Sequence, residues 1–509
     1  MQKIESYLTS IAIMIKYLLG ILLLLVISEN SVSQTYSIAG LIGPRTSNAV
    51  DILGHDENYF YNIFKALNKN GTSESWTFEE RSIDNLEKKF SFPIVEKDID
   101  ENLLRILNTS YCKAGLVVFY IKYVKSEKTF SLMMANLKVD EKPHWIKSLV
   151  FEESYSKSIG VHFDVFQNED GSFFLASTKR KPNSSYTIEE PDFEIAYYDE
   201  NLNQLFKKNF SFESEHAHLT RLYQDNNKNL FVIYLDRIQP SNYFMSKLLF
   251  INTKTGESKR SDLWDFEEKD QQRTIIDKKD YVFCNDDAGN TIMSTQIVNE
   301  KKWGTNQSTG IAILKVDKSG SIIAKEKYSW NKSISEKGVL ENYSVYSIAQ
   351  NEKGGNNVIL NCVFESHGDN SSYIYNYEIL SVETDGQSIA GSCLINRSGI
   401  LLSRSQTDFS SQIMIRNGKK TFLLYNQEAN TLAKKEPARI KDPNRDTRAA
   451  ISQLNGGLNY VENDLNLVIE GDNECQIQPL QSFAFAENQI LTIAATDDNL
   501  YFLKISLNK

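Results

Sequence analysis

Residues 168–180, NEDGSFFLASTKR, contain a polar turn with a glycine, followed by an apolar run of strand-forming residues. The same event recurs along the chain, with apolar runs beginning at Tyr59, Leu116, Phe173, Leu230, Thr291, Val358, Thr421 and Ile490. The first three intervals are 57 residues each, and the next four are 61, 67, 63 and 69. This internal repeat predicts one array of stacked units in place of several separate domains.

Each repeat divides into four predicted strands, A to D. In the third repeat these are Val161–Phe166, Phe173–Thr178, Phe193–Tyr198 and Leu205–Phe212. The turns between strands C and D open with Asp or Asn, and several contain Gly, as in DKSG at 317–320. Such residues form tight hairpin turns. Four antiparallel strands at this period predict an all-β chain of propeller blades.

The two ends of the chain are expected to form one blade together. The eighth repeat has strands A (Leu480–Phe485), B (Ile490–Ala494) and C (Leu500–Ile505), and the sequence then ends without a D strand. An unpartnered apolar segment, Tyr36–Ile42, can supply it. We therefore expect eight blades, with the ring closed by pairing of the N-terminal strand with the C-terminal blade.

Seven blades plus an irregular segment is the second interpretation. The repeat that begins at Thr421 is the loosest, because a long charged insert displaces its expected C strand to about Ala450–Asn459. Nearly all of the mature chain resembles the β-propeller superfamily, and no specific family within it is indicated. The recurring histidine and Trp-Asp signature of WD40 repeats is absent, and so are the Asp boxes of sialidases.

Composition narrows the class of function. The chain has 509 residues, 41% of them apolar and 11% aromatic, which is enough to build a large core. Its net charge of -10 is spread along the sequence without a basic block, so we expect no nucleic-acid partner. A diffuse negative charge keeps a protein soluble, and we expect a monomer.

The N-terminus resembles a signal peptide. Residues 17–27, YLLGILLLLVI, follow Lys16 and precede the small residues Ser31-Val32-Ser33. We predict cleavage after Ser33, with translation starting at Met1 or Met14, which leaves residues 34–509 as one propeller domain. The protein would then be exported to the periplasm, the cell surface or the medium, without stable membrane insertion. The alternative is an anchor over 8–27, in which Lys16 costs about 2.5–3.5 kcal/mol at mid-membrane.

The cysteines do not form a disulfide framework. There are five of them, at Cys112, Cys284, Cys362, Cys393 and Cys475, and no two are close in sequence. Cys362 and Cys393 fall on the second and fourth strands of one repeat, a separation of about 9.6 Å, which a disulfide cannot bridge. We expect all five to be buried and unpaired.

A binding site is predicted on one face of the ring. The A–B and C–D turns are short, whereas the B–C and D–A connections carry most of the length variation and share the opposite face. We expect the B–C connections at Lys179–Asp192, Arg237–Ser246, Asn299–Thr309 and Glu365–Ser372. They carry four candidate ligand-binding aromatic residues, Tyr186, Tyr243, Phe244 and Trp303. The alternative is that these side chains fold back and seal the blades.

A weaker candidate is a metal site. His216 and His218 lie two apart before strand A of the fourth repeat, and His162 and Asp164 lie on strand A of the third. Innermost strands line the centre of a propeller, so these four side chains could converge on one ion. The favoured interpretation is polar residues in a wet channel, so we expect no metal and no cofactor.

The sequence favours an exported, non-catalytic module that presents one face to a protein or carbohydrate partner. Neither G-x-S-x-G, H-E-x-x-H, a P-loop nor a dinucleotide fingerprint occurs in it. The alternative is an extracellular carbohydrate-active hydrolase or lyase, with acidic residues on the same face or in the central channel.

Overall fold

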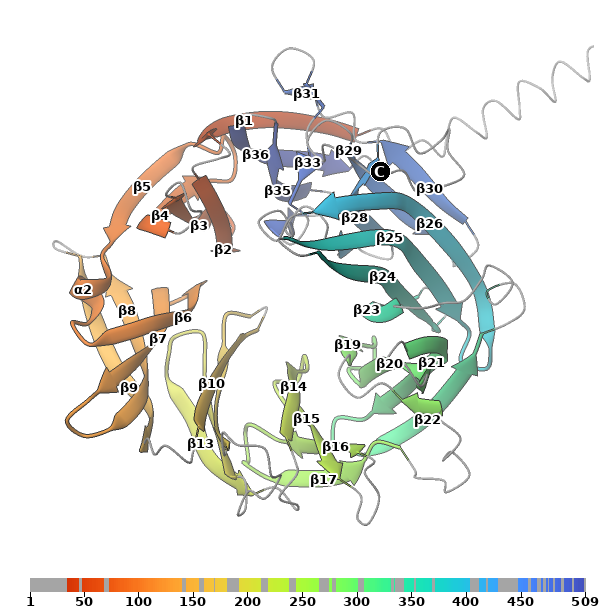
Figure 1. Cartoon of the computed structure of the whole chain (residues 1–509), viewed down its shortest axis with the longest axis horizontal. Helices are drawn as coiled ribbons and strands as arrows, with labels where there is room; N and C mark the ends of the chain where they lie inside the picture. Colours follow the sequence, from red (N-terminus) through yellow and green to blue (C-terminus); the bar gives the residue numbers. More distant parts are fainter. Residues whose placement is uncertain are drawn as a thin grey trace, which may run out of the picture.

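The computed structural model is an all-β ring of eight four-stranded blades, an eight-bladed β-propeller (Figure 1). This confirms the predicted fold class and excludes the seven-bladed interpretation. The structure describes residues 34–507 except 45–47, 68–72, 140–142, 155–159, 169, 181–191, 212–217, 238–243, 265–273, 277–280, 301–305, 331–333, 335–342, 352–353, 369–370, 403–411, 418–419, 429–446, 456–458, 465–467, 470–472, 475, 479–480, 487–488 and 497–498. In this part of the chain, we find no helix with the length and hydropathy needed to cross a bilayer.

The first four blades are antiparallel sheets whose strands run in order from the ring axis outward. Blade 1 comprises β2 (Asn48–His55), β3 (Tyr59–Leu67), β4 (Ser73–Ser82) and β5 (Lys88–Ile94), followed by the short helix α2 (Glu96–Ile99). Blade 2 comprises β6 (Leu103–Cys112), β7 (Gly115–Val124), β8 (Thr129–Lys138) and β9 (His144–Ser154). Blade 3 comprises β10 (Gly160–Gln167), β11 (Phe173–Arg180), β12 (Asp192–Tyr198) and β13 (Gln204–Ser211). Blade 4 comprises β14 (His218–Gln224), β15 (Leu230–Arg237), β16 (Phe244–Ile251) and β17 (Ser258–Asp262).

The other four blades follow the same plan, with small additions to the innermost strand of two of them. Blade 5 comprises β18 (Thr274–Ile276) and β19 (Val282–Asn285), then β20 (Thr291–Glu300), β21 (Asn306–Val316) and β22 (Ile322–Ser329). Blade 6 comprises β23 (Tyr343–Gln350), β24 (Asn356–Gly368), β25 (Ser371–Thr384) and β26 (Ile389–Leu402). Blade 7 comprises β27 (Gln412–Asn417), β28 (Lys420–Glu428), β29 (Thr447–Asn455) and β30 (Asn459–Asp464); the small pair β31 (Val468–Ile469) and β32 (Asn473–Glu474) follows it. Blade 8 comprises β33 (Gln476–Ile477), β34 (Phe483–Ala486), β35 (Gln489–Ala495), β36 (Asn499–Leu507) and β1 (Gln34–Pro44).

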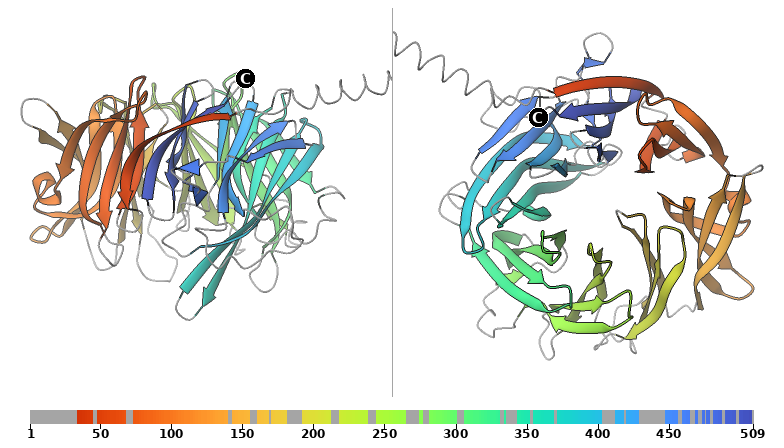
Figure 2. Two further views of the ribbon diagram at one scale, coloured as in Figure 1. Left: turned by 90° about the horizontal axis from the view of Figure 1, so that it is seen from above. Right: turned by 180° about the vertical axis from the view of Figure 1, so that it is seen from behind.

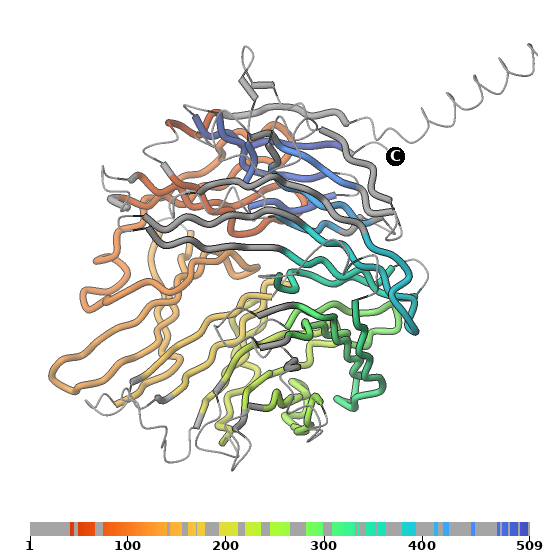
Figure 3. The backbone as a smooth tube through the Cα atoms, turned by 45° about the vertical axis from the view of Figure 1, so that its right-hand side comes forward, coloured from red at the N-terminus to blue at the C-terminus, as the bar shows by residue number. Residues whose placement is uncertain are grey.

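The ring closes through blade 8, as predicted. Strand β1 pairs antiparallel with β36, from Gln34 opposite Leu507 to Pro44 opposite Asn499. The first and last blades consequently lie side by side (Figure 3). The displaced C strand of blade 7 is also present as β29, beyond the insert that made this repeat irregular in sequence.

The core consists of layers between blades. Among the described residues, each pair of neighbouring blades encloses one hydrophobic cluster. Strand β11 shows why the middle strands are continuous apolar runs: Phe173 and Leu175 pack toward blade 2, whereas Phe174 and Ala176 pack toward blade 4. Because both faces of a middle strand are buried, every position in the run is apolar.

The outermost strands are built differently. Strand β22 has one exposed position after every partly buried one over Ile322–Lys327, and its exposed positions include Lys325 and Lys327. Charged side chains on an edge strand oppose pairing with another sheet.

Two B–C connections are shorter than predicted. Glu365–Ser372 is not a loop, because β24 continues to Gly368 and β25 begins at Ser371, forming a hairpin that projects beyond the ring (Figure 2). The segment 371–377, SSYIYNY, is rich in β-branched and aromatic residues that favour continued pairing. Likewise, β20 extends to Glu300 and β21 begins at Asn306, which shortens the assigned loop at 299–309.

The cysteine prediction holds in part. Cys112 is buried and free, whereas Cys284 is only half-buried, because it lies on the innermost strand β19. Cys362 and Cys393 lie on β24 and β26, with β25 between them, as predicted. Cys475 lies outside the described residues.

Candidate functional site

The antiparallel order of the strands gives the ring two unlike faces. We call the side of the A–B and C–D connections the turn face, and the side of the B–C and D–A connections the loop face. Turn-face connections range from two residues (418–419) to six (252–257). B–C connections range from two residues (369–370) to eighteen (429–446). The length variation therefore lies on the loop face, where a rigid scaffold usually carries its binding residues.

The prediction that aromatic residues of the loop face bind a ligand is not tested by the structure. Tyr186, Tyr243 and Trp303 lie outside the described residues. Phe244 is not in a loop, because it is the first residue of β16 and pairs with Arg237 of β15. The strand begins earlier than predicted because Phe244-Met245-Ser246 continues the apolar pattern of β16.

The structure places two of the four candidate metal ligands together. His162 and Asp164 lie on β10, and His162 Nε2 is 2.9 Å from Asp164 Oδ1. His218 is the first residue of β14, and His216 lies outside the described residues. Among the side chains described, no three His, Cys, Asp or Glu residues gather closely enough to hold an ion. Convergence of all four residues is thus untested.

A pocket of about 430 Å³ lies between blades 1 and 2. Its walls come from β2, β3 and β4 of blade 1 and from β6 of blade 2, with one residue of β10 in blade 3 (Figure 1). Its apolar lining is Ile52, Leu53, Ile63, Ile106 and Leu107. Its polar and aromatic lining is Asp51, Lys65, Trp76, Asn108, Thr109, Ser110 and Gln167. Since β2, β6 and β10 are innermost strands, the pocket lies near the ring axis.

An ion pair occupies one wall of this pocket. Lys65 Nζ donates to Asp51 Oδ2 across the β2–β3 pair, and both side chains keep partial access to solvent. The same ammonium lies 5.0 Å from the ring centroid of Trp76, which extends from β4 beside Lys65. A cation over an indole face is held by the ring quadrupole. Trp76 therefore fixes the position of Lys65, and Lys65 fixes that of Asp51.

The opposite wall carries uncharged polar groups. Ser110 Oγ donates to Asn108 Oδ1 at 2.6 Å, and both residues line the pocket. Gln167 Nε2 donates to the carbonyl of Tyr111 at 3.0 Å, and this bond joins blade 3 to blade 2 beside the pocket. The lining thus offers donors and acceptors of both charged and neutral kinds.

A carboxyl and tyrosine cluster lies at the turn-face end of the same blade interface. Tyr61 donates to Asp56 Oδ2 at 2.5 Å, and its ring stacks on that of Tyr111 with centroids 3.4 Å apart. Burial and the hydrogen bond to Asp56 raise the pKa of Tyr61, and burial raises the pKa of Tyr111. Both phenols therefore keep their protons near pH 7 and are weaker acids than a free tyrosine.

The two carboxyl groups of this cluster behave differently. Burial and the nearby Asp56 carboxylate raise the pKa of Glu80. Burial alone would raise the pKa of Asp56, but hydrogen bonds from Tyr61 and from the backbone of Asn58 and Tyr59 outweigh it and lower that pKa. Carboxyl groups with pKa values moved apart are a known arrangement for acid–base chemistry.

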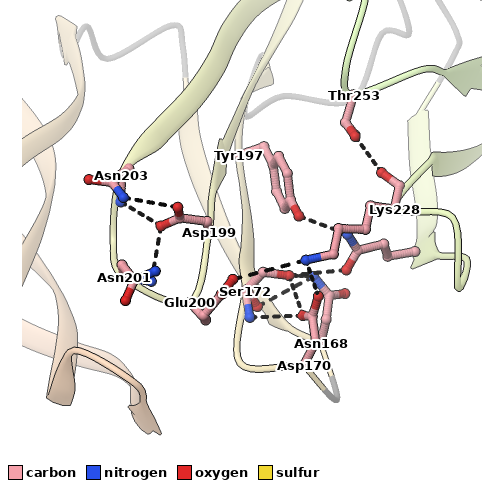
Figure 4. A network of polar contacts seen from close by, with 11 residues as sticks. Asn168, Asp170, Ser172, Tyr197, Asp199, Glu200, Asn201, Asn203, Lys228 and Thr253 are labelled. Atoms are coloured by element: carbon pink, nitrogen blue, oxygen red, sulfur yellow. Dashed lines mark hydrogen bonds and ion pairs between the residues drawn. The ribbon is translucent and has the colours of Figure 1, made fainter.

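The turn around Asn168, with which the description of the sequence repeat begins, is part of the scaffold (Figure 4). Asn168 Nδ2 donates to Ser172 Oγ at 2.9 Å, and Gly171 adopts a φ of 79°. Lys228 of the next blade reaches Asp170 Oδ2 at 3.2 Å. This hydrogen bond, together with the blade 3 carboxylate Glu200 at 4.0 Å, raises the pKa of Lys228. The polar residues of this turn therefore join blades 3 and 4.

Comparison with known proteins adds no family. No family model and no curated protein matches the chain. The WD40 domain of SCAP from fission yeast is 10% identical, with a TM-score of 0.39, and the match covers 94% of this chain and 98% of that one. A PL25 ulvan lyase is 8% identical with a TM-score of 0.37, covering 91% and 95%. The propeller domain of the trilobed protease from Pyrococcus furiosus is 11% identical with a TM-score of 0.33, covering 84% and 97%. None of these likenesses assigns a function to this chain.

Proposed function

We propose that this protein is an exported, non-catalytic β-propeller that binds a protein or glycan through its loop face. The observation that carries the proposal is the difference between the two faces. Turn-face connections range only from two to six residues, whereas the B–C connections range from two to eighteen. A scaffold with one uniform and one variable face presents binding residues on the variable one.

The charged groups of the pocket support recognition over proton transfer. Asp51 and Lys65 form an ion pair, so each already faces a group of opposite charge. A general acid or base works best when its pKa lies near the working pH and its proton is free to move. A paired carboxylate and ammonium instead offer a fixed acceptor and a fixed donor.

The test uses the chain beginning at Gln34, screened on a glycan array and in a pull-down from envelope material of the source cell. Trp303→Ala and Tyr243→Ala should each weaken capture of the partner at least fivefold while the melting temperature stays unchanged. Leu205→Ala is the control, because Leu205 is an exposed apolar side chain on the outermost strand β13. If these two variants lose stability but still capture the partner, the loop-face proposal is wrong.

The carbohydrate-active alternative has its own test, motivated by Glu80 and Asp56. Incubation with neutral and acidic polysaccharides should release no new reducing or unsaturated ends. If such ends appear and Glu80→Gln abolishes them, the protein is a hydrolase or lyase. Export itself is checked by N-terminal sequencing of the secreted protein, for which we expect Gln34 as the first residue.

A further inference from the structure

We propose that the pocket between blades 1 and 2 binds a single neutral saccharide unit. The ligand class deepens the proposed function, but the site is separate from the loop-face aromatics. Side chains of three blades line this pocket, and a volume of about 430 Å³ is in the lower part of the range for small-molecule sites. That size suits a single sugar ring better than a folded partner or a long chain.

The charge of the pocket selects a neutral ligand. Asp51 and Lys65 are its charged lining residues and form an ion pair. An anionic ligand attracted by the Lys65 ammonium would meet the Asp51 carboxylate beside it, and a cationic ligand would meet the ammonium. A neutral molecule with several hydroxyl groups uses both, because a hydroxyl donates to the carboxylate and accepts from the ammonium.

The uncharged lining fits the same ligand. Asn108 and Gln167 carry amides, which donate and accept, and Ser110 adds a hydroxyl. Aliphatic side chains, with Ile63 buried beneath them, provide an apolar wall for the C–H groups of a sugar ring. Lys65 covers a face of the Trp76 indole, so the ligand would reach the rest of that side chain and change its fluorescence.

The experiment is a titration of the full chain with glucose, galactose, mannose and N-acetylglucosamine, and with glucuronate and glucosamine as charged comparators. Tryptophan emission and the melting temperature are recorded. At least one neutral sugar should bind at millimolar concentration, raise the melting temperature and change the emission. Trp76→Phe should remove the emission change. A flat response to every neutral sugar overturns the inference.

Two variants examine the recognition itself. Asn108→Ala should weaken binding of that sugar about tenfold, as expected for loss of one or two hydrogen bonds. Asp51→Asn leaves Lys65 without its carboxylate and should turn the preference toward glucuronate by about tenfold. Gln387→Ala is the matched control, because Gln387 is exposed in the turn after β25, in blade 6. Unchanged sugar affinity in Asn108→Ala, or unchanged preference in Asp51→Asn, counts against the pocket as the site.

The two proposals fail separately. If Trp303→Ala and Tyr243→Ala abolish partner capture while no sugar binds the pocket, the proposed function stands and this inference falls. If a neutral sugar binds and Asn108→Ala weakens it while the loop-face variants change nothing, the pocket stands and the loop face falls.

Discussion

The turn face and the loop face differ in what their polar residues do. On the turn face, an Asp opens the connection and accepts a hydrogen bond from the backbone N–H four residues later. This occurs at Asp199 (2.8 Å), Asp225 (2.7 Å), Asp286 (2.7 Å) and Asp317 (2.9 Å). Repetition of one bond in successive blades shows that these residues are required by the fold. The loop-face connections vary in length and are free to serve a ligand.

A second turn-face feature joins the blades to one another. In four successive blades the innermost strand ends in an amide that bonds to the preceding blade. These are Gln167 to the Tyr111 carbonyl, Gln224 to the Tyr197 hydroxyl, Asn285 to the Tyr223 hydroxyl, and Gln350 from the Asp287 backbone N–H. The turn face is therefore a continuous polar seam over this half of the ring, and substitutions there should act on stability before they act on binding.

The largest effect should come from filling a turn-face glycine. Gly320 has a φ of 77°, and a Cβ there would overlap the ring of Phe250 in the neighbouring blade. Gly320→Ala should lower the free energy of unfolding by about 2–5 kcal/mol. Gly256→Ala is the matched control, because Gly256 has a φ of 71° with no atom within 4 Å of the added Cβ, and it should cost only about 1 kcal/mol. Equal losses in urea denaturation would contradict the packing between blades 4 and 5.

The next effect concerns Asp286, whose carboxylate lies 2.6 Å from Lys315 and is nearly inaccessible to solvent. Burial alone would raise the pKa of Asp286, but the bonds from Lys315 and Asn290 outweigh it and lower that pKa. A lowered pKa stabilises the fold above the unfolded value near pH 4, and the stabilisation disappears as the pH falls through the folded pKa. Asp286→Asn should cost about 1–3 kcal/mol at pH 7.

The measurement is thermal unfolding of both proteins between neutral and acidic pH. The gap between wild type and Asp286→Asn should narrow on acidification, because the wild-type carboxyl becomes protonated and loses its charge-assisted bond. A gap that stays constant down to acid unfolding would show that the Lys315 pair contributes nothing.

A smaller loss of stability should follow from removing the side-chain hydrogen bonds that join blades 3 and 4 on the turn face. Gln224 accepts from Ser172 Oγ at 3.1 Å and donates to the Tyr197 hydroxyl at 2.9 Å. Gln224→Ala should cost about 1–2 kcal/mol, measured by urea denaturation. Gln387→Ala, the exposed control, should be neutral within about 0.5 kcal/mol. If both variants are neutral, the seam is not a stabilising element.

The smallest effect should come from the loop face. A short Gly-Ser insertion within 181–191, the B–C connection of blade 3, should cost about 0.6 kcal/mol or less. The same insertion after Asn201, in the C–D turn of that blade, breaks the bonds from Asn203 to Asp199 and should cost about 2 kcal/mol. The two melting temperatures compare the faces directly, and equal costs would remove the distinction between them.

The fold could be predicted from the sequence because short stretches of residues mark the strands and turns of each repeat. In most blades strand B contains an apolar run next to a turn with Asp, Asn or Gly, so Phe173 and Leu230 mark strand starts without knowledge of any contact. Closure by the N-terminal strand also followed from counting strands. The extension of β24 and β25 was missed because Gly368 and the polar residues after it resemble an early turn.

The pocket could not be predicted in the same way. Asp51, Lys65 and Trp76 lie on three strands of one repeat, and Asn108 and Gln167 come from the next two. None of them departs from the strand pattern, and their meeting depends on how far the blades separate near the axis. One weak signal existed, since strand β3 carries a charged residue, Lys65, in a run that is apolar or aromatic except for Asn62. The ion pair between Asp51 and Lys65 joins two strands, and the order of residues along the sequence does not reveal which side chains meet across strands.

The pairing of Gln34 with Leu507 determines which face of the propeller would lie toward a surface to which the N-terminal segment is attached. Both residues lie at the end of β36 where blade 8 would otherwise have its C–D turn, so both ends of the folded strands emerge on the turn face. Any leader or tether before Gln34 would hold the ring by that face. The hairpin of β24 and β25 and the long connections would then point outward, so retention of the leader and removal of the leader leave the same side open to a partner.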